Sequence, residues 1–127
     1  MNNIPDELKY STDHEWLRLL DDGTAQVGIT DFAQSRLGDI TFVELPEEGE
    51  DFAKGESFCV VESVKAASDV YLMAAGEILE INSALEDEPE LINQDAYGEG
   101  WIVKIRLAGR TDLDDLLSAR DYARSIA

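Results

Sequence analysis

Lys65 is the residue of this sequence that is best placed to do chemistry. The chain contains only four lysines, and Lys65 lies between two strand-like runs beside the compact residues Val64, Ala66 and Ala67. We predict a tight turn from which its amine projects with little cover. An enzyme that acylates one lysine and ignores the others requires such an amine on a rigid tip. Because most lysines are exposed and inert, local context alone does not assign this role.

Other reactive residue types give weaker candidates. His14-Glu15 does not continue into the HExxH pattern of zinc proteases, because the chain has a single histidine. The one cysteine, Cys59, lies in the apolar run 58–61, where burial raises the pKa of a thiol and favours a core role. One cysteine and one histidine cannot form a Cys/His zinc site, so we expect no metal there. The carboxylates are too numerous to single out a catalytic pair.

The charge of the chain narrows the classes of partner. Ten Lys plus Arg against 28 Asp plus Glu give a formal net charge of −18. The cations are scattered, so neither nucleic acid nor an anionic membrane is an expected partner. Such a field instead favours solubility and steering toward proteins that present basic patches. The polar, acidic start lacks a targeting pattern, which indicates a bacterial cytoplasmic protein, although a mature protein of the mitochondrial matrix would look the same.

The first half of the chain must supply a sheet around the lysine. Residues 15–29 predict a β-hairpin, with Asp22-Gly23 suited to its turn. Thr30 can cap a short helix over residues 31–37, which Gly38 would end. Residues 40–45 then predict a strand that stops at Pro46.

The second half predicts a pair of related strands and a helical end. Two Gly-Glu dipeptides open the runs 57–62 and 78–82, which we interpret as two related hairpin halves facing one another across a shared core. The remaining expected elements are a turn at 63–69, a strand over 70–73, a helical turn over 84–92 broken at Pro89, a loop over 93–100, and a strand over 101–107. Thr111 should cap a C-terminal helix whose apolar stripe holds Leu113, Leu116, Leu117 and Tyr122.

A family resemblance adds to these observations. The run VVESVKAASDVY at 60–71 resembles the lipoylation motif of glycine cleavage H proteins, in which the lysine of ESVKA carries lipoate. Further fragments resemble that family in order and spacing over nearly the whole chain: HEW at 14–16, VGITDFAQ at 27–34, LGDI at 37–40, FVELPE at 42–47, ALEDEPELIN at 84–93 and YGEGW at 97–101.

The resemblance implies a fold and a function. The expected fold is mainly β, a hybrid barrel-sandwich with short helices that include a C-terminal one, forming a single lipoyl-binding domain over residues 1–127. The expected protein is a monomeric, non-catalytic carrier. It would move the aminomethyl group of glycine from glycine decarboxylase, the P protein, to the aminomethyltransferase, or T protein. Dihydrolipoamide dehydrogenase, the L protein, would reoxidise the arm, and a lipoate ligase or octanoyl transferase would act during its attachment.

The resemblance also implies roles for individual residues. Lys65 would hold lipoate as an amide. Glu15, expected at a partly exposed position, would contact the amine of the loaded arm, and Asp69 would lie beside that arm. Glu62, Ser63 and Asp69 would alternatively serve recognition by the lipoylating enzyme.

The sequence departs from the family in two places and leaves rival functions open. Met73 replaces a usual proline, which predicts a less rigid return strand, and Phe32 and Arg36 leave the short helix without the histidine that some members carry. A carrier that relays lipoyl groups to other complexes would need the same lysine. A biotin carrier is less favoured, because Val64 and Ala66 stand where methionines are usual, and an acidic hydrolase lacks a catalytic pair.

Overall fold

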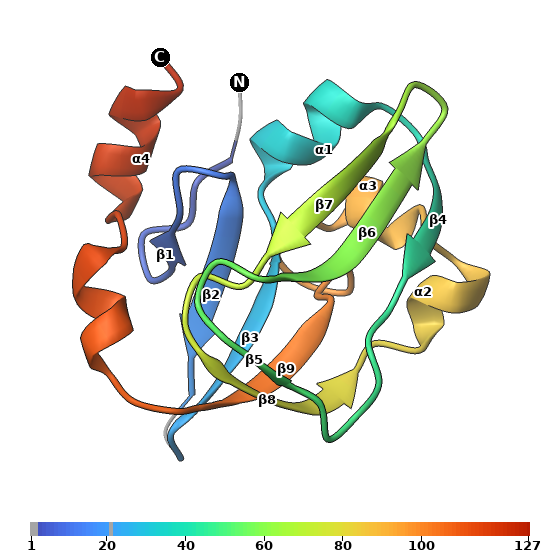
Figure 1. Cartoon of the computed structure of the whole chain (residues 1–127). Helices are drawn as coiled ribbons and strands as arrows, with labels where there is room; N and C mark the ends of the chain where they lie inside the picture. The colour runs from blue at the N-terminus through green and yellow to red at the C-terminus, as the bar shows by residue number, and fades with distance from the viewer. Residues whose placement is uncertain (1–2, 21) are drawn as a thin grey trace.

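Two antiparallel sheets face one another in the computed structural model, which describes residues 3–20 and 22–127 (Figure 1). One sheet has six strands in the order β1-β2-β3-β9-β8-β5, and the other has three in the order β4-β6-β7. The strands are β1 Lys9–Tyr10, β2 Glu15–Leu19, β3 Thr24–Ile29, β4 Ile40–Glu44, β5 Asp51–Phe52, β6 Ser57–Ser63, β7 Ala67–Tyr71, β8 Gly76–Ile81 and β9 Val103–Leu107. The prediction of a mainly β sandwich is confirmed.

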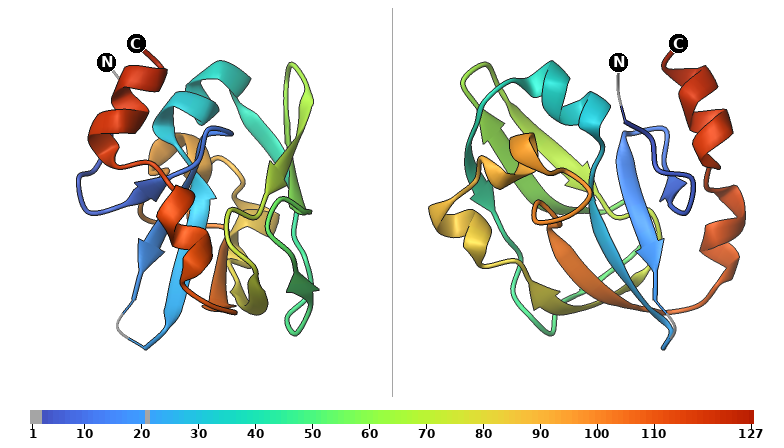
Figure 2. Two further views of the ribbon diagram at one scale, coloured as in Figure 1. Left: turned by 60° about the vertical axis from the view of Figure 1, so that its left-hand side comes forward. Right: turned by 180° about the vertical axis from the view of Figure 1, so that it is seen from behind.

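The helices are short and lie around the sheets (Figure 2). They are α1 Asp31–Leu37, α2 Ala84–Asp87, α3 Leu91–Gln94, the 3₁₀ helix η1 Thr111–Asp115, and α4 Ala119–Ser125. No helix in the described part of the chain is long and apolar enough to cross a bilayer.

The main core fills the space between the two sheets. Alternate residues of β6 and β7 turn inward, so that Val61 and Val70 are buried against Val27 of β3 and Ile105 of β9. The runs that begin with Gly-Glu thus form β6 in one sheet and β8 in the other, as expected of strands that share one core. A smaller apolar cluster lies under α4 and includes Tyr10, Trp16 and Tyr122.

The predicted hairpin and first helix are confirmed. β2 and β3 pair from Glu15 opposite Ile29 to Leu19 opposite Ala25. Asp21, which comes just before the predicted turn Asp22-Gly23, lies outside the described residues. Thr30 caps α1, because its side chain accepts a hydrogen bond from the amide of Ala33. Gly38 ends this helix with a positive φ of 81°, a conformation that favours glycine.

The C-terminal helix is present, but its predicted start at Thr111 is wrong. Residues 111–115 form η1, with no side-chain cap, and a separate helix α4 begins after Ser118, whose hydroxyl accepts from the amide of Asp121. Leu117 separates the two because it pairs with Tyr10 as a β-bridge through backbone hydrogen bonds of 2.9 and 2.7 Å. Tertiary pairing at Leu117 therefore overrides its helix propensity.

Other boundaries shift by a few residues. β7 begins at Ala67 and ends at Tyr71, so the lysine turn is shorter than the predicted 63–69. β9 begins at Val103 rather than at Trp101. The helical turn over 84–92 is two helices, α2 and α3, separated around Pro89, and the second runs into the predicted loop at 93–100.

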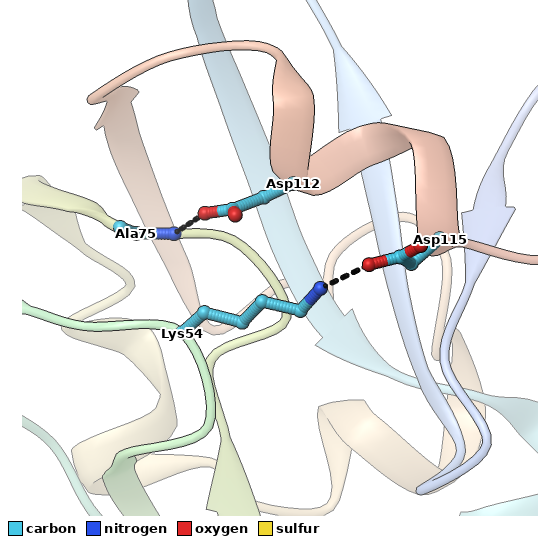
Figure 3. Close-up of polar contacts among 4 residues, drawn as sticks. All are labelled: Lys54, Ala75, Asp112 and Asp115. Atoms are coloured by element: carbon cyan, nitrogen blue, oxygen red, sulfur yellow. Dashed lines mark hydrogen bonds and ion pairs between the residues drawn. The ribbon is translucent and has the colours of Figure 1, made fainter.

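Two polar contacts attach η1 to the body of the sandwich (Figure 3). The Asp112 carboxylate accepts a hydrogen bond of 2.9 Å from the backbone amide of Ala75, which lies just before β8. The Lys54 ammonium, between β5 and β6, lies 2.9 Å from the Asp115 carboxylate. These contacts fix η1 over the connection between the two sheets.

Candidate functional site

Lys65 lies at the tip of the hairpin that joins β6 and β7. Ser63 shapes this turn, because its hydroxyl oxygen lies 3.2 Å from the amides of both Lys65 and Ala66, which donate to it. The Ser63 amide also donates to the Ala66 carbonyl at 2.8 Å. The side chain of Lys65 is exposed on this braced turn, as the sequence predicts.

Lys65 differs from two of the other lysines in its charge environment. Lys54 pairs with Asp115, and the Lys104 ammonium lies 3.9 Å from the Glu80 carboxylate. Among residues 3–20 and 22–127, no carboxylate lies within 4.0 Å of the Lys65 amine. Within this part of the chain, no ion pair restrains the Lys65 amine.

A cleft of about 480 Å³ lies beside the Lys65 hairpin, between α1, β7 and the end of the chain. Its wall includes Leu37, and the next residue, Gly38, lies under the Lys65 side chain: a Cβ built on Gly38 would be 3.6 Å from Lys65 Cε. Leu37 thus brings one wall of the cleft next to the residue over which the Lys65 side chain lies. It is lined by Asp13, His14, Glu15, Ile29, Phe32, Ala33, Arg36, Leu37, Val61, Ser68, Asp69, Val70, Ser125, Ile126 and Ala127.

Glu15 lines this cleft and links the two sheets. It belongs to β2, yet its Oε2 accepts a 3.0 Å hydrogen bond from the Tyr71 amide of β7. Its Oε1 accepts a 2.5 Å hydrogen bond from the Ser11 hydroxyl. The prediction that Glu15 is partly exposed is wrong, because only 2% of the residue is accessible to solvent. The first residue of β2 lies inside the sandwich because its carboxylate finds partners there.

Burial sets the protonation of Glu15. Loss of solvation raises the pKa of this carboxyl from 4.5 to about 7, although the hydrogen bonds from Ser11 and Tyr71 act in the opposite direction. The neighbouring Asp13 adds to the rise. Glu15 is therefore a buried carboxyl whose charged form is disfavoured in this cleft.

His14 forms the part of the cleft next to α4. Its Nδ1 lies 2.9 Å from the Tyr122 hydroxyl, which is also 2.7 Å from the Thr30 hydroxyl. Burial lowers the pKa of His14, and Arg36 acts in the same direction while Asp13 opposes it. His14 has a φ of 69°, so the chain turns sharply just before Glu15. On α1, the side chains that line the wall are those of Phe32 and Arg36. The histidine of the cleft comes instead from His14, the residue just before β2.

The remaining predicted residues lie on the Lys65 hairpin in different roles. Asp69 lines the cleft, and its carboxylate accepts a 2.9 Å hydrogen bond from the Ser57 hydroxyl. Glu62 is half-buried on β6 opposite Ala67. The Ser63 hydroxyl is engaged within the turn itself. The structure therefore brings Glu15 and Asp69 to one cleft and leaves Glu62 and Ser63 beside the lysine.

Sequence reasoning missed several parts of the cleft. Ser11 and the backbone amide of Tyr71 hold Glu15, and neither stands in a motif that signals this role. The end of the chain, residues 125–127, also forms a wall, which no sequence pattern indicated. Only His14 carried a usable signal, since it adjoins Glu15 in the HEW fragment.

Comparison with known proteins finds close relatives in both sequence and structure. Residues 8–127 match the family described as Glycine cleavage H-protein. A glycine cleavage system H protein from Chromobacterium violaceum is 59% identical over 126 residues, which cover 99% of this chain and 98% of that one. One from Psychrobacter sp. (strain PRwf-1) is 58% identical over 122 residues, with coverages of 96% and 97%. The crystal structure of a glycine cleavage system H protein from Mycobacterium marinum matches with a TM-score of 0.90 at 41% identity, covering 97% of this chain and 98% of that one.

Proposed function

The chain belongs to the glycine cleavage H-protein family, and we propose that it is a lipoyl carrier, without catalytic activity of its own, whose attachment site is Lys65. Residues 1–127 would act as one lipoyl-binding domain. The carrier would take the aminomethyl group of glycine from the P protein, deliver it to the T protein, and return to its oxidised form through the L protein.

The observation that carries this proposal is the presentation of Lys65. Its amine is exposed, makes no ion pair among the described residues, and stands on a turn that Ser63 braces. Enzymes that modify one lysine must reach it on a surface whose shape they can recognise. We propose that Glu62, Ser63 and Asp69, which lie on the same hairpin as Lys65, contribute to recognition by the lipoylating enzyme.

The cleft beside Lys65 fits an amide-linked arm. Its wall combines the apolar Ile29, Leu37 and Val70 with the acidic Asp69 and Glu15, so it can accept both a hydrocarbon chain and a cation. When bound, lipoate supplies a dithiolane whose thiol–disulfide exchange serves both loading and reoxidation. The residues of this chain hold and shield the arm.

Glu15 is the residue that we assign to the amine end of the cargo. In the free cleft its ionised form is disfavoured by burial, as the pKa of about 7 indicates. An ammonium group placed beside it would stabilise the carboxylate, because an opposite charge at close range favours the charged form. Asp69 lines the same cleft and adds negative potential there.

Acylation of the unmodified protein tests the assignment of Lys65. The wild-type chain, Lys65→Arg and the matched control Lys54→Arg are incubated with lipoate, ATP and a lipoate–protein ligase, and intact mass and peptide mapping are recorded. We expect one lipoyl group on the wild type and on Lys54→Arg, and none on Lys65→Arg. An unmodified wild type, or a modified Lys65→Arg, would overturn the assignment.

A second assay tests the pathway. Purified P protein is supplied with the lipoylated chain, and glycine-dependent exchange of bicarbonate is measured. We expect the lipoylated wild type to stimulate this exchange and unmodified Lys65→Arg not to do so. Failure of the lipoylated protein to stimulate it would favour a relay of lipoyl groups to other complexes.

A further inference from the structure

Asn93 links three segments behind the Lys65 hairpin. It belongs to α3, which lies beside α1 and the start of β4 (Figure 1). Its Oδ1 accepts a 2.8 Å hydrogen bond from the Ile40 amide, and its Nδ2 donates to the Gly38 carbonyl and to Gln34 Oε1, both at 2.9 Å. One side chain therefore holds the backbone on both sides of Asp39.

Asp39 accepts the backbone hydrogen bond that joins the start of β4 to the lysine turn. β4 and β6 pair as far as Ile40 opposite Ser63, and one further hydrogen bond of 3.1 Å runs from the Val64 amide to the Asp39 carbonyl. Val64 directly precedes Lys65 and is 67% exposed, so its side chain gives the turn little packing. The Asp39 contact thus extends the sheet by one step toward the lysine.

We propose that Asn93 is a positioning residue for Lys65, acting through Asp39 and Val64. By fixing Gly38 and Ile40, it holds the Asp39 carbonyl in place for the Val64 amide, and so keeps the turn in the orientation that an acylating enzyme binds. The geometry itself is independent of lipoylation, but its consequence for acylation rests on the function proposed above.

An amide side chain suits this position. One oxygen accepts from Ile40 while one NH₂ group donates to two oxygens, which uses both kinds of hydrogen-bonding atom at once. A carboxylate could keep the contact with the Ile40 amide, but its second oxygen would face the Gly38 carbonyl oxygen and Gln34 Oε1. Gly38 leaves room for the lysine stem, which lies over it.

The expected effect is on recognition rather than on the chemical step. Acylation forms an amide between Lys65 Nζ and the lipoyl carbonyl carbon and breaks the bond from that carbon to the phosphate oxygen of AMP. AMP leaves with the bonding electron pair, and two of the three ammonium protons are released while one stays on the amide nitrogen. Lipoate and ATP supply the activated acyl group, with release of pyrophosphate. A loosened turn must be ordered again when the enzyme binds. Restricting about one residue costs roughly tenfold in affinity.

The test compares Asn93 with a second asparagine that lies away from the lysine. Asn82 also donates two hydrogen bonds from its Nδ2, to the carbonyls of Glu99 and Trp101, at 2.8 and 2.7 Å. Asn93→Ala, Asn93→Asp and the control Asn82→Ala are assayed with lipoate, ATP and a lipoate–protein ligase. Amide exchange at Val64 is followed by NMR in the same unmodified proteins.

For the Asn93 variants we expect the KM for the acceptor protein to rise roughly tenfold, with kcat within about twofold of the wild type. Exchange at Val64 should accelerate by a similar factor, measured relative to core amides such as that of Val61, which corrects for any change in global stability. Asn82→Ala should leave both the KM and this ratio unchanged. A folded Asn93 variant with wild-type KM and wild-type relative exchange at Val64 would overturn the proposal, as would equal effects of Asn82→Ala.

Exchange in the wild-type protein supplies a measurement that needs no variant. If the Asn93 contacts support the turn, the amides of Ile40 and Val64 should be protected to within about threefold of each other, since they open together. A Val64 amide that exchanges like an unfolded peptide beside a protected Ile40 would refute the coupling. A wild-type protein that is not acylated at Lys65 would instead refute the proposed function and leave the exchange result standing.

Discussion

The Glu15→Gln variant should become more stable relative to the wild-type protein as the pH rises. In the folded protein Glu15 keeps its proton up to about pH 7, whereas the unfolded chain releases it near 4.5. Between these values the folded state binds more protons than the unfolded state, so the free energy of unfolding falls with increasing pH. Glutamine cannot ionise, and its amide oxygen can still accept from the Tyr71 amide.

The size of this effect follows from the two pKa values. With 4.5 for the unfolded chain and about 7 for the folded protein, ionisation of Glu15 lowers the free energy of unfolding by roughly 2 to 3 kcal/mol between pH 5 and pH 8. The difference between Glu15→Gln and the wild type should grow by this amount over the same interval. Other titrating groups, such as His14, are present in both proteins and are removed by the subtraction.

Urea unfolding at both pH values measures the effect. Glu86→Gln is the matched control, because Glu86 is exposed on α2 and its replacement changes the formal charge equally. The control should track the wild type at both pH values. A difference between Glu15→Gln and the wild type that stays constant with pH, or that grows toward acid, would refute the interpretation of Glu15 as a buried carboxyl with a raised pKa.

Three further outcomes follow from the packing. Burial raises the pKa of Cys59 to about 12, so iodoacetamide should label it only as the protein unfolds, and rapid labelling of the native state would contradict its burial. Gly28→Ala should reduce the free energy of unfolding in urea by about 1–3 kcal/mol, because its Cβ would lie 2.7 Å from the buried Trp16 ring; wild-type stability would show that the ring can move. Lys54→Ala should lower stability slightly in dilute buffer and not in concentrated salt, since the pair with Asp115 is exposed, and a loss of stability that persists in salt would contradict this.

Local signals explain which elements could be predicted from the sequence. Thr30 and Gly38 mark the ends of α1 with a hydroxyl cap and a positive φ, both of which depend on residues close in the chain. The turn at Lys65 is likewise local, because Ser63 and Ala66 close it. Such elements are encoded within a few residues, and these predictions hold.

Long-range pairing explains what could not be predicted. The break between η1 and α4 comes from Leu117 pairing with Tyr10, which no local pattern reveals. The burial of Glu15 depends on the Tyr71 amide, fifty-six residues away in the chain. A glutamate at a strand start is ordinarily expected at the surface, so its partners become visible only once the two sheets are assembled.

The strand order also sets the course of folding. β6 and β7 are neighbours in sequence, so the hairpin that carries Lys65 needs only a short loop to close. β3 and β9 come from opposite ends of the chain, and the centre of the six-stranded sheet cannot form until Thr24 meets Arg106. Because non-local pairings close slowly, we expect the lysine hairpin to form early and the cleft wall to be completed late. The proposed attachment point is thus the part of the protein that is built quickly, whereas the cleft that we propose to shield the cargo waits for the slowest contacts.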